Sequence, residues 1–317
     1  MTTMHLVDPE LRSILQVIPP MDFSPEALAT RRANTARTFS SQAVPEGLAV
    51  TVDEIFVPGP SAAPPVRVLG YRPTRVEGPL PTILQIHGGG HVLGLPEMMD
   101  LANRDLAASL SCAVYSVDYR LSPETIYPEP LEDCYAVLGW LHANAGALSL
   151  DPRRIGVKGE SAGGNMAAGL ALLARDRGEF DLAFQHLVMP SLDDTTCLST
   201  NPNPTTGEFI WTREQSRFGW TSYLGVAPGS DNISPYAAPA RAQELAGLPP
   251  AFISVGALDL FLEENLEYAR RLSRAGVPVE LHVYPGAYHG YEMVETAEVT
   301  RRAKRDSKDA LERAMRA

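Results

Sequence analysis

Residues 153–175 read RRIGVKGESAGGNMAAGLALLAR and join a strand-like run to a helix-like run through a serine flanked by small residues. The helix-like run is rich in alanine and leucine, as expected of a helix buried on most sides. A serine held in a sharp turn between a strand and a helix needs small neighbours, and the turn lifts its hydroxyl above the sheet edge. The stretch therefore predicts an α/β fold with Ser161 as a candidate nucleophile, although a plain tight turn would also fit the Gly-x-Ser-x-Gly spacing.

The chain around this stretch alternates short β-branched runs with longer helical patterns from about residue 50 onward. Such alternation predicts a mainly parallel sheet with helices on both faces. The first two strands are joined only by PGPSAAPP, which is too short for a crossover helix, so they should pair antiparallel. We expect strands at 49–57, 65–71, 82–87, 113–119, 154–159, 186–190, 251–256 and 279–285, and helices at about 98–109, 129–145, 162–176, 212–224, 263–275 and 294–315.

Two regions fit this alternation poorly, namely residues 1–45 and about 195–235. We interpret 1–45 as the N-terminal part of a helical cap and 46–317 as the main domain, with about 195–235 as a cap insertion. The insertion carries Trp211, Phe218 and Trp220. Aromatic residues at this spacing pack in an ordinary core, but they would line a substrate pocket if the insertion folds over the carboxyl edge of the sheet.

Composition and charge exclude several classes of function. The 317 residues carry a formal net charge of −11, which repels phosphate backbones and anionic lipids, so we expect no nucleic-acid partner. No apolar run is long enough to cross a bilayer, and the N-terminus lacks a signal-peptide pattern. The three cysteines lie far apart, without disulfide or zinc spacing. These features predict a cytoplasmic protein with no stable membrane insertion, and they leave a monomer or a homodimer open.

A triple glycine directly follows the expected strand at 82–87, in QIHGGGHVLG at 85–94. Without Cβ atoms, such a loop can bring backbone N–H groups close to a bound substrate. His87 and His91 are four residues apart, but metal binding at that spacing requires a helix, which three glycines oppose. No Lys-Ser/Thr pair follows the glycines, so a phosphate loop is also disfavoured. We therefore expect no metal and no cofactor.

A base and an acid follow the last two expected strands. His289 lies in VYPGAYHGYE after the final strand, and Asp259 lies in ISVGALDLFLEE after the strand before it. Asp259 could instead cap the next helix, and Glu263, Asp193 or Asp194 are alternative acids. The order Ser161, Asp259, His289 places three loops at the carboxyl ends of parallel strands, where open sheets bind ligands.

The chain resembles the hormone-sensitive-lipase-like branch of the α/β-hydrolase carboxylesterases. The resemblance rests on HGGG at 87, DYRLSPE at 118, GESAGG at 159, ALDLFLEE at 257 and YHGY at 288, and it runs from about residue 50 to 300. It implies an α/β-hydrolase fold, with an eight-stranded mostly parallel sheet, helices on both faces and a helical cap. It also implies that Tyr119, Arg120 and Glu124 support the site. Two departures are Glu160, where the family commonly has Asp, and His91, where it commonly has an aromatic residue.

The resemblance and the residue order together predict a serine hydrolase. Ser161, Asp259 and His289 would form the catalytic triad. The resemblance assigns oxyanion N–H donors to Gly89 and Gly90, and the start of the helix after the serine adds a third donor, that of Ala162.

The expected activity is hydrolysis of short- to medium-chain carboxylic esters through an acyl-enzyme. The small-molecule ester would bind near His91, Trp211, Phe218 and Trp220. An arylformamidase or amidase with the same triad and a non-catalytic small-molecule receptor of the same fold are the alternatives.

Overall fold

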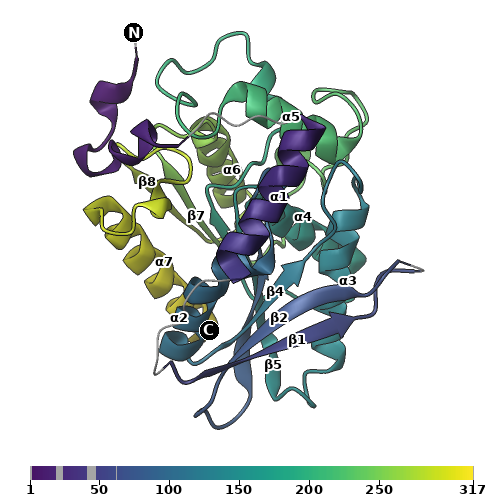
Figure 1. Cartoon of the computed structure of the whole chain (residues 1–317). Coiled ribbons are helices and arrows are strands. Elements are labelled where there is room, and N and C mark those ends of the chain that lie inside the picture. The colour runs from purple at the N-terminus through teal and green to yellow at the C-terminus, as the bar shows by residue number, and fades with distance from the viewer. Residues whose placement is uncertain (1, 19–23, 41–47, 62, 317) are drawn as a thin grey trace.

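The computed structural model describes residues 2–18, 24–40, 48–61 and 63–316 (Figure 1). Its centre is an eight-stranded sheet in the order β1-β2-β4-β3-β5-β6-β7-β8. Strand β2 pairs antiparallel with β1 and β4, and the other neighbours pair parallel. The strands are β1 (Val50–Val57), β2 (Val66–Pro73), β3 (Leu80–Ile86), β4 (Ala113–Asp118), β5 (Leu150–Glu160), β6 (Gln185–Val188), β7 (Ala251–Gly256) and β8 (Val279–Tyr284). The predicted fold class and the antiparallel start are confirmed.

Helices cover both faces of this sheet. The α-helices are α1 (Pro25–Ser40), α2 (Asp100–Leu110), α3 (Glu129–Ala143), α4 (Ala162–Arg177), α5 (Arg213–Leu224), α6 (Leu262–Arg274) and α7 (Glu298–Arg316). Apolar side chains of α3, α4, α5 and α6 share one buried cluster with the sheet, whereas those of α2 and α7 share another. The central strand β3 is buried along its whole length, as expected of a strand covered on both sides.

The sequence assigns residues 1–45 to a helical cap but does not give the bounds of α1, because its residues carry few apolar positions. Its place is fixed instead by Arg32, whose Nε donates to Val92 O at 2.8 Å and whose Nη2 donates to Ser122 O at 2.6 Å. The same guanidinium pairs with Glu124 at 2.8 Å. Helix α1 is thus attached to the loops that follow β3 and β4, on the side of the sheet's carboxyl edge (Figure 1).

The residues before α1 contact a different part of the same edge. Glu208 accepts hydrogen bonds from Thr3 N and from the hydroxyls of Thr2 and Thr3. Tyr288 donates from its hydroxyl to Leu11 O at 3.0 Å. The N-terminal segment therefore packs on the loop after β8 and on the stretch before α5. None of the helices in these described ranges is long and apolar enough to cross a membrane.

Three buried histidines make the free energy of unfolding depend on pH. Burial lowers the pKa of His87 to about 4, that of His91 to about 3 and that of His186 well below its usual value. In the unfolded chain, each imidazole takes up a proton below about pH 6.5. The unfolded state therefore binds more protons than the folded state in this range, so the free energy of unfolding falls as the pH decreases from about 6.5 toward 4.

The variant His186→Gln should be less sensitive to acid than the parent protein. His186 stacks on Phe252 at 4.2 Å and its Nε2 lies 2.8 Å from Ser307 Oγ, a contact that a Gln amide can replace. Removing one of three such imidazoles should reduce the slope of unfolding free energy against pH by about 1.4 kcal/mol per unit near pH 5. Denaturant unfolding at several pH values measures this slope. The exposed His5→Gln variant should keep the parent slope, and an unchanged slope in His186→Gln would contradict the explanation.

Candidate active site

Ser161 occupies a strained turn between β5 and α4. Its backbone has φ 54° and ψ −117°, a conformation that L-residues rarely adopt. Its N–H donates to Val188 O at 2.9 Å, which ties the turn to the neighbouring strand β6. A Cβ on Gly159 would lie 2.1 Å from Gly163 O, and one on Gly163 would lie 2.2 Å from Ile86 O. The turn can form only because glycine stands at both positions, which explains the GESAGG spacing.

The structure brings the three sequence-predicted residues Ser161, His289 and Asp259 together in one hydrogen-bonded chain. Ser161 Oγ lies 2.9 Å from His289 Nε2, and His289 Nδ1 lies 2.8 Å from Asp259 Oδ2. The side chains of His289 and Asp259 are 8% and 1% exposed. A proton on Nδ1 donated to the carboxylate leaves Nε2 free to accept the serine proton. The geometry therefore meets the requirement for an activated hydroxyl nucleophile.

Asp259 is held by a second contact that leaves one oxygen for the histidine. Its Oδ1 accepts a hydrogen bond from Phe261 N at 2.9 Å, just before helix α6. The Phe261 ring packs edge-on against the His289 ring, with centroids 5.1 Å apart. The carboxylate and the aromatic ring together fix the plane of the imidazole. The carboxylate of Asp259 does not cap α6, because the N-cap residue is Phe261 and it has no side-chain cap hydrogen bond in the described structure. Its Oδ1 closes the turn before the helix, and its Oδ2 orients His289.

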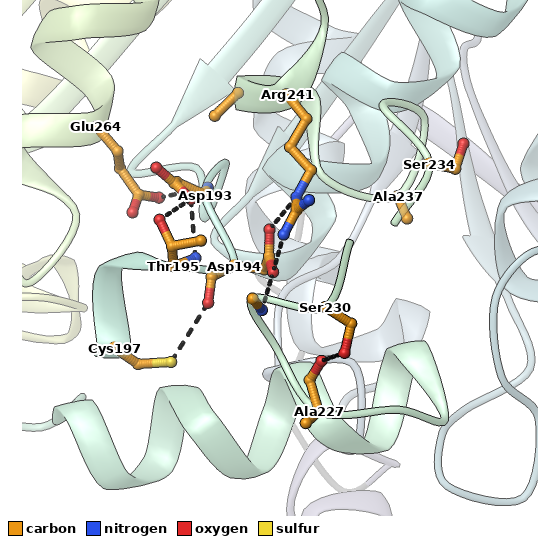
Figure 2. Close-up of polar contacts among 12 residues, drawn as sticks. Asp193, Asp194, Thr195, Cys197, Ala227, Ser230, Ser234, Ala237, Arg241 and Glu264 are labelled. Atoms are coloured by element: carbon orange, nitrogen blue, oxygen red, sulfur yellow. Dashed lines mark hydrogen bonds and ion pairs between the residues drawn. The ribbon is translucent and has the colours of Figure 1, made fainter. Parts of the chain in front are cut away.

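The alternative acids have other partners, as Figure 2 shows for two of them. Asp194 forms a two-pronged ion pair with Arg241, at 2.7 and 2.9 Å, and accepts from Gly229 N. Asp193 Oδ1 accepts from the backbone and the hydroxyl of Thr195. The third alternative, Glu263, accepts from the amide of Asn203 at 3.3 Å. None of the three is the acid paired with His289 in the described structure.

The glycine loop after β3 lies against the turn that carries Ser161. A Cβ on Gly88 would be 3.5 Å from the Ser161 Cβ, so the two backbones are close neighbours. Gly89 and Gly90 have φ of 126° and 60°, which only glycine adopts without strain. A Cβ on Gly90 would also meet the Trp211 ring at 2.3 Å. No described residue accepts a hydrogen bond from the N–H of Gly89 or Gly90, so both remain available to a ligand.

Residues from the YRLSPE stretch support this loop. The Tyr119 hydroxyl donates to His87 O at 2.9 Å, and the two rings stack with centroids 4.3 Å apart. Arg120 binds the buried carboxylate of Asp133 through Nε and Nη2. Glu124 is the partner of Arg32 described above. Tyr119 thus holds the base of the glycine loop, whereas Arg120 and Glu124 attach their own loop to α3 and α1.

A small cavity opens beside the serine hydroxyl. It has space of about 10 Å³, enough for roughly one water molecule. Three of the four predicted pocket residues, His91, Trp211 and Trp220, line it. Phe218 does not, because residues 216, 219 and 220 form the cavity-facing side of α5, whereas position 218 points in another direction around the helix.

Four further residues line the cavity without having been predicted. They are Ser191, Ser216, Gly219 and Phe261. Ser216 and Gly219 follow the i, i+3 spacing of the face that carries Trp220, so the helical period could have identified them. Ser191 and Phe261 come from loops after β6 and β7, and no local pattern marks them. Among the residues that the structure describes, no group of three His, Cys, Asp or Glu side chains could hold a metal ion.

Comparisons with known proteins show the family of the chain. A family model described as alpha/beta hydrolase fold matches residues 83–293. The carboxylesterase NlhH of Mycobacterium tuberculosis is 35% identical over 292 residues, covering 90% of this chain and 88% of that protein. An arylesterase of Saccharolobus solfataricus is 30% identical over 289 residues, covering 90% and 92% of the two chains. The solved structure of a bacterial heroin esterase matches with a TM-score of 0.92 at 41% identity and covers all of both chains. The chain therefore belongs to the α/β-hydrolase family, and the resemblance to its hormone-sensitive-lipase-like branch is confirmed.

Proposed function

We propose that the protein is a serine carboxylesterase that hydrolyses short- to medium-chain carboxylic esters through an acyl-enzyme. The observation that carries the proposal is the continuous hydrogen-bonded chain from Ser161 Oγ through His289 to Asp259. A serine hydroxyl is a weak nucleophile unless a neighbouring base accepts its proton. The esterase names of the relatives support the same activity for this chain.

The reaction would proceed in two halves. His289 accepts the proton of Ser161 while the serine oxygen attacks the ester carbonyl, and Asp259 stabilises the charged imidazolium. His289 then gives that proton to the leaving alcohol, which leaves the acyl group on the serine. A water molecule attacks the acyl-enzyme while His289 accepts one of its protons, and His289 returns that proton to the Ser161 oxygen as the carboxylic acid is released. The only protein side chains that this scheme requires are those of Ser161, His289 and Asp259.

The developing oxyanion would bind to backbone N–H groups of the glycine loop and of α4. Gly89 and Gly90 carry two candidate donors, as described above. Ala162 is the first residue of α4, where an N–H has no acceptor within the helix. The helix N-terminus also favours negative charge. Each such donor stabilises a transition-state oxyanion by about 3 kcal/mol in comparable sites.

The narrow cavity predicts a preference for the shortest acyl chains within the proposed range. Trp211 and Trp220 are 7% and 2% exposed and close the space beside Ser161, so longer chains would have to displace packed aromatic rings. With p-nitrophenyl esters, kcat/KM should be highest for acetate or butyrate and about 10-fold lower or more for octanoate. Hydrolysis of p-nitrophenyl acetate, butyrate, octanoate and palmitate measures this preference. A maximum at palmitate would contradict it.

Matched substrates separate this function from its alternatives. The arylformamidase or amidase alternative predicts faster cleavage of p-nitroacetanilide than of p-nitrophenyl acetate relative to their rates in water. The receptor alternative predicts that neither is cleaved. A receptor has no use for the pairing between Ser161 and His289, which favours the enzyme.

Location and partners are further parts of the proposal. The buried, free thiols of Cys112, Cys134 and Cys197 fit a reducing compartment such as the cytoplasm. A small-molecule ester is the expected partner, nucleic acid is not expected because of the charge of −11, and a homodimer remains an expectation from the family.

A further inference from the structure

The cavity beside Ser161 has room for the carbonyl oxygen of an ester but not for an acyl chain. Its space of about 10 Å³ holds roughly one water molecule, and Gly90 and Ala162, two of the proposed oxyanion donors, line it. The chain carbons of an acyl group must therefore lie outside it, beyond the side chains that form its wall. Trp211, Trp220 and Phe261 are among them.

Of these three aromatic side chains, Trp211 is the one that the core does not hold. Trp220 lies within α5 and belongs to the large apolar cluster that this helix shares with the sheet. The Phe261 N–H donates to Oδ1 of the triad acid Asp259 at 2.9 Å. Trp211 precedes α5 and packs in a separate small cluster with Leu260 and Phe261. An acyl chain that needs more room therefore displaces the Trp211 indole first.

The backbone next to Trp211 is strained. Ile210 is β-branched, yet its φ of 63° lies in the left-handed region. The Trp211 N–H donates to Phe209 O at 2.7 Å, which closes a three-residue turn around Ile210. A γ-turn with a positive φ at its central residue is rare and strained. Such strain persists only where surrounding contacts enforce it, and it is concentrated at ligand clamps and switch segments.

The N-terminal segment supplies contacts that keep this turn closed. Glu208 accepts a hydrogen bond from Thr3 N at 2.6 Å and from the hydroxyls of Thr2 and Thr3 at 2.5 Å each. We call these three hydrogen bonds the clasp. Hydrogen bonds to an ionised acceptor are stronger than those between neutral groups. The Phe209 ring also packs against the Tyr288 ring, with centroids 5.9 Å apart.

We propose that Trp211 sets the length of acyl chain that the enzyme accepts, and that the clasp between Glu208 and residues 2 and 3 controls this limit by holding the strained turn closed. This inference rests on the proposed esterase function and adds the residues that determine its substrate range. A long acyl chain binds only when the indole moves aside. Any change that loosens the turn raises the fraction of enzyme in that state, so long chains gain more than acetate.

The acyl side of the ester is the side that Trp211 blocks. His289 gives its proton to the leaving alcohol, so the alcohol lies next to the histidine. The acyl chain extends from the other side of the reacting carbon, toward the glycine loop. Atoms of the indole lie 2.3, 3.0 and 3.2 Å from the ideal Cβ of Gly90, whereas the centroids of the indole and the imidazole are 6.1 Å apart.

The first test removes the indole. The quantity compared is kcat/KM for p-nitrophenyl octanoate divided by kcat/KM for p-nitrophenyl acetate, from initial rates of p-nitrophenol release. Trp211→Leu should raise this ratio by about 10-fold or more, because Leu frees part of the ring volume and keeps an apolar contact with Leu260. Trp140→Leu removes an indole on α3 that packs against Tyr115, and should leave the ratio within about two-fold.

The second test leaves the indole in place and removes the clasp. Glu208 is exposed, so Glu208→Ala should fold like the parent enzyme. It should raise the ratio by about 3-fold or more, and by less than Trp211→Leu, because the indole is only held less firmly. Glu208→Gln keeps one acceptor oxygen and should lie between the parent and Glu208→Ala. Glu214→Ala removes an exposed carboxylate from α5 and should leave the ratio within about two-fold.

A double variant shows whether the clasp acts through the indole. If it does, Trp211→Leu combined with Glu208→Ala should have the ratio of Trp211→Leu alone. An unchanged ratio in Trp211→Leu that is folded by circular dichroism would overturn the role of the indole. An unchanged ratio in Glu208→Ala, or a further rise in the double variant, would overturn the role of the clasp. Absence of ester hydrolysis by the parent enzyme would instead overturn the proposed function.

Discussion

Replacing Ser161 by Ala should reduce kcat for p-nitrophenyl acetate by about 10⁵- to 10⁶-fold while leaving the fold intact. The loss is this large because the nucleophile and its base act as one unit, and only the oxyanion donors and binding remain without the hydroxyl. Ala fits the site because the Ser161 side chain makes one side-chain hydrogen bond in the described structure, between its hydroxyl and His289. Initial rates from stopped or continuous assays, with circular dichroism for the fold, measure the effect.

A matched variant shows whether this loss is specific. Ser109 is exposed on α2, and its hydroxyl donates only to Asp105 O within the same helix. Ser109→Ala should therefore keep the parent kcat within about two-fold, as expected of a surface substitution. If Ser161→Ala retained more than a hundredth of the parent activity, the serine would be a turn residue and the proposed mechanism would be wrong.

Replacing Asp259 by Asn should lower kcat by about 10⁴-fold with little effect on KM. The Oδ1 atom of Asp259 accepts from Phe261 N, so an Asn side chain would keep its oxygen there and turn its NH₂ group toward His289 Nδ1. Nδ1 must then be an acceptor, which places the imidazole proton on Nε2. That tautomer cannot accept the proton of Ser161. Steady-state kinetics at a pH near 7 give the two constants.

The carboxylate of Asp193, in the loop after β6, supplies the control for this prediction. Its Oδ1 accepts from Thr195 N and Oγ1, and an Asn oxygen can take both hydrogen bonds. Asp193→Asn should therefore leave kcat unchanged within about two-fold. A loss in Asp193→Asn as large as that in Asp259→Asn would mean that the general negative charge at this edge, rather than the tautomer of His289, supports the reaction.

The sequence predicts the sheet and the triad because both depend on short patterns. Each strand is a compact β-branched run, and the glycines at 159 and 163 are required by close backbone contacts with residues next to them in space. The order of Ser161, Asp259 and His289 then places all three at one edge, because parallel strands end there together. The hydrogen bonds of the triad agree with that prediction.

The parts that the sequence does not predict depend on contacts between distant segments. Helix α1 is positioned by Arg32, whose partners Val92, Ser122 and Glu124 lie in two separate loops. Phe218 does not line the cavity because another face of α5, the one that carries Gly219, meets the glycine loop. The sequence marks His91 as a candidate pocket residue where the family commonly has an aromatic one, but it does not show its surroundings. Its lack of partners is visible only once Tyr223 and the cavity surround it.

The central claim is that Ser161 is the nucleophile, and covalent labelling tests it most directly. A fluorophosphonate reacts with serines that a neighbouring histidine activates. The account predicts one phosphonyl group per chain, located by peptide mapping on the peptide that contains Ser161, with loss of esterase activity in proportion to labelling. Labelling at another residue, or full esterase activity in protein that carries the label on Ser161, would contradict it.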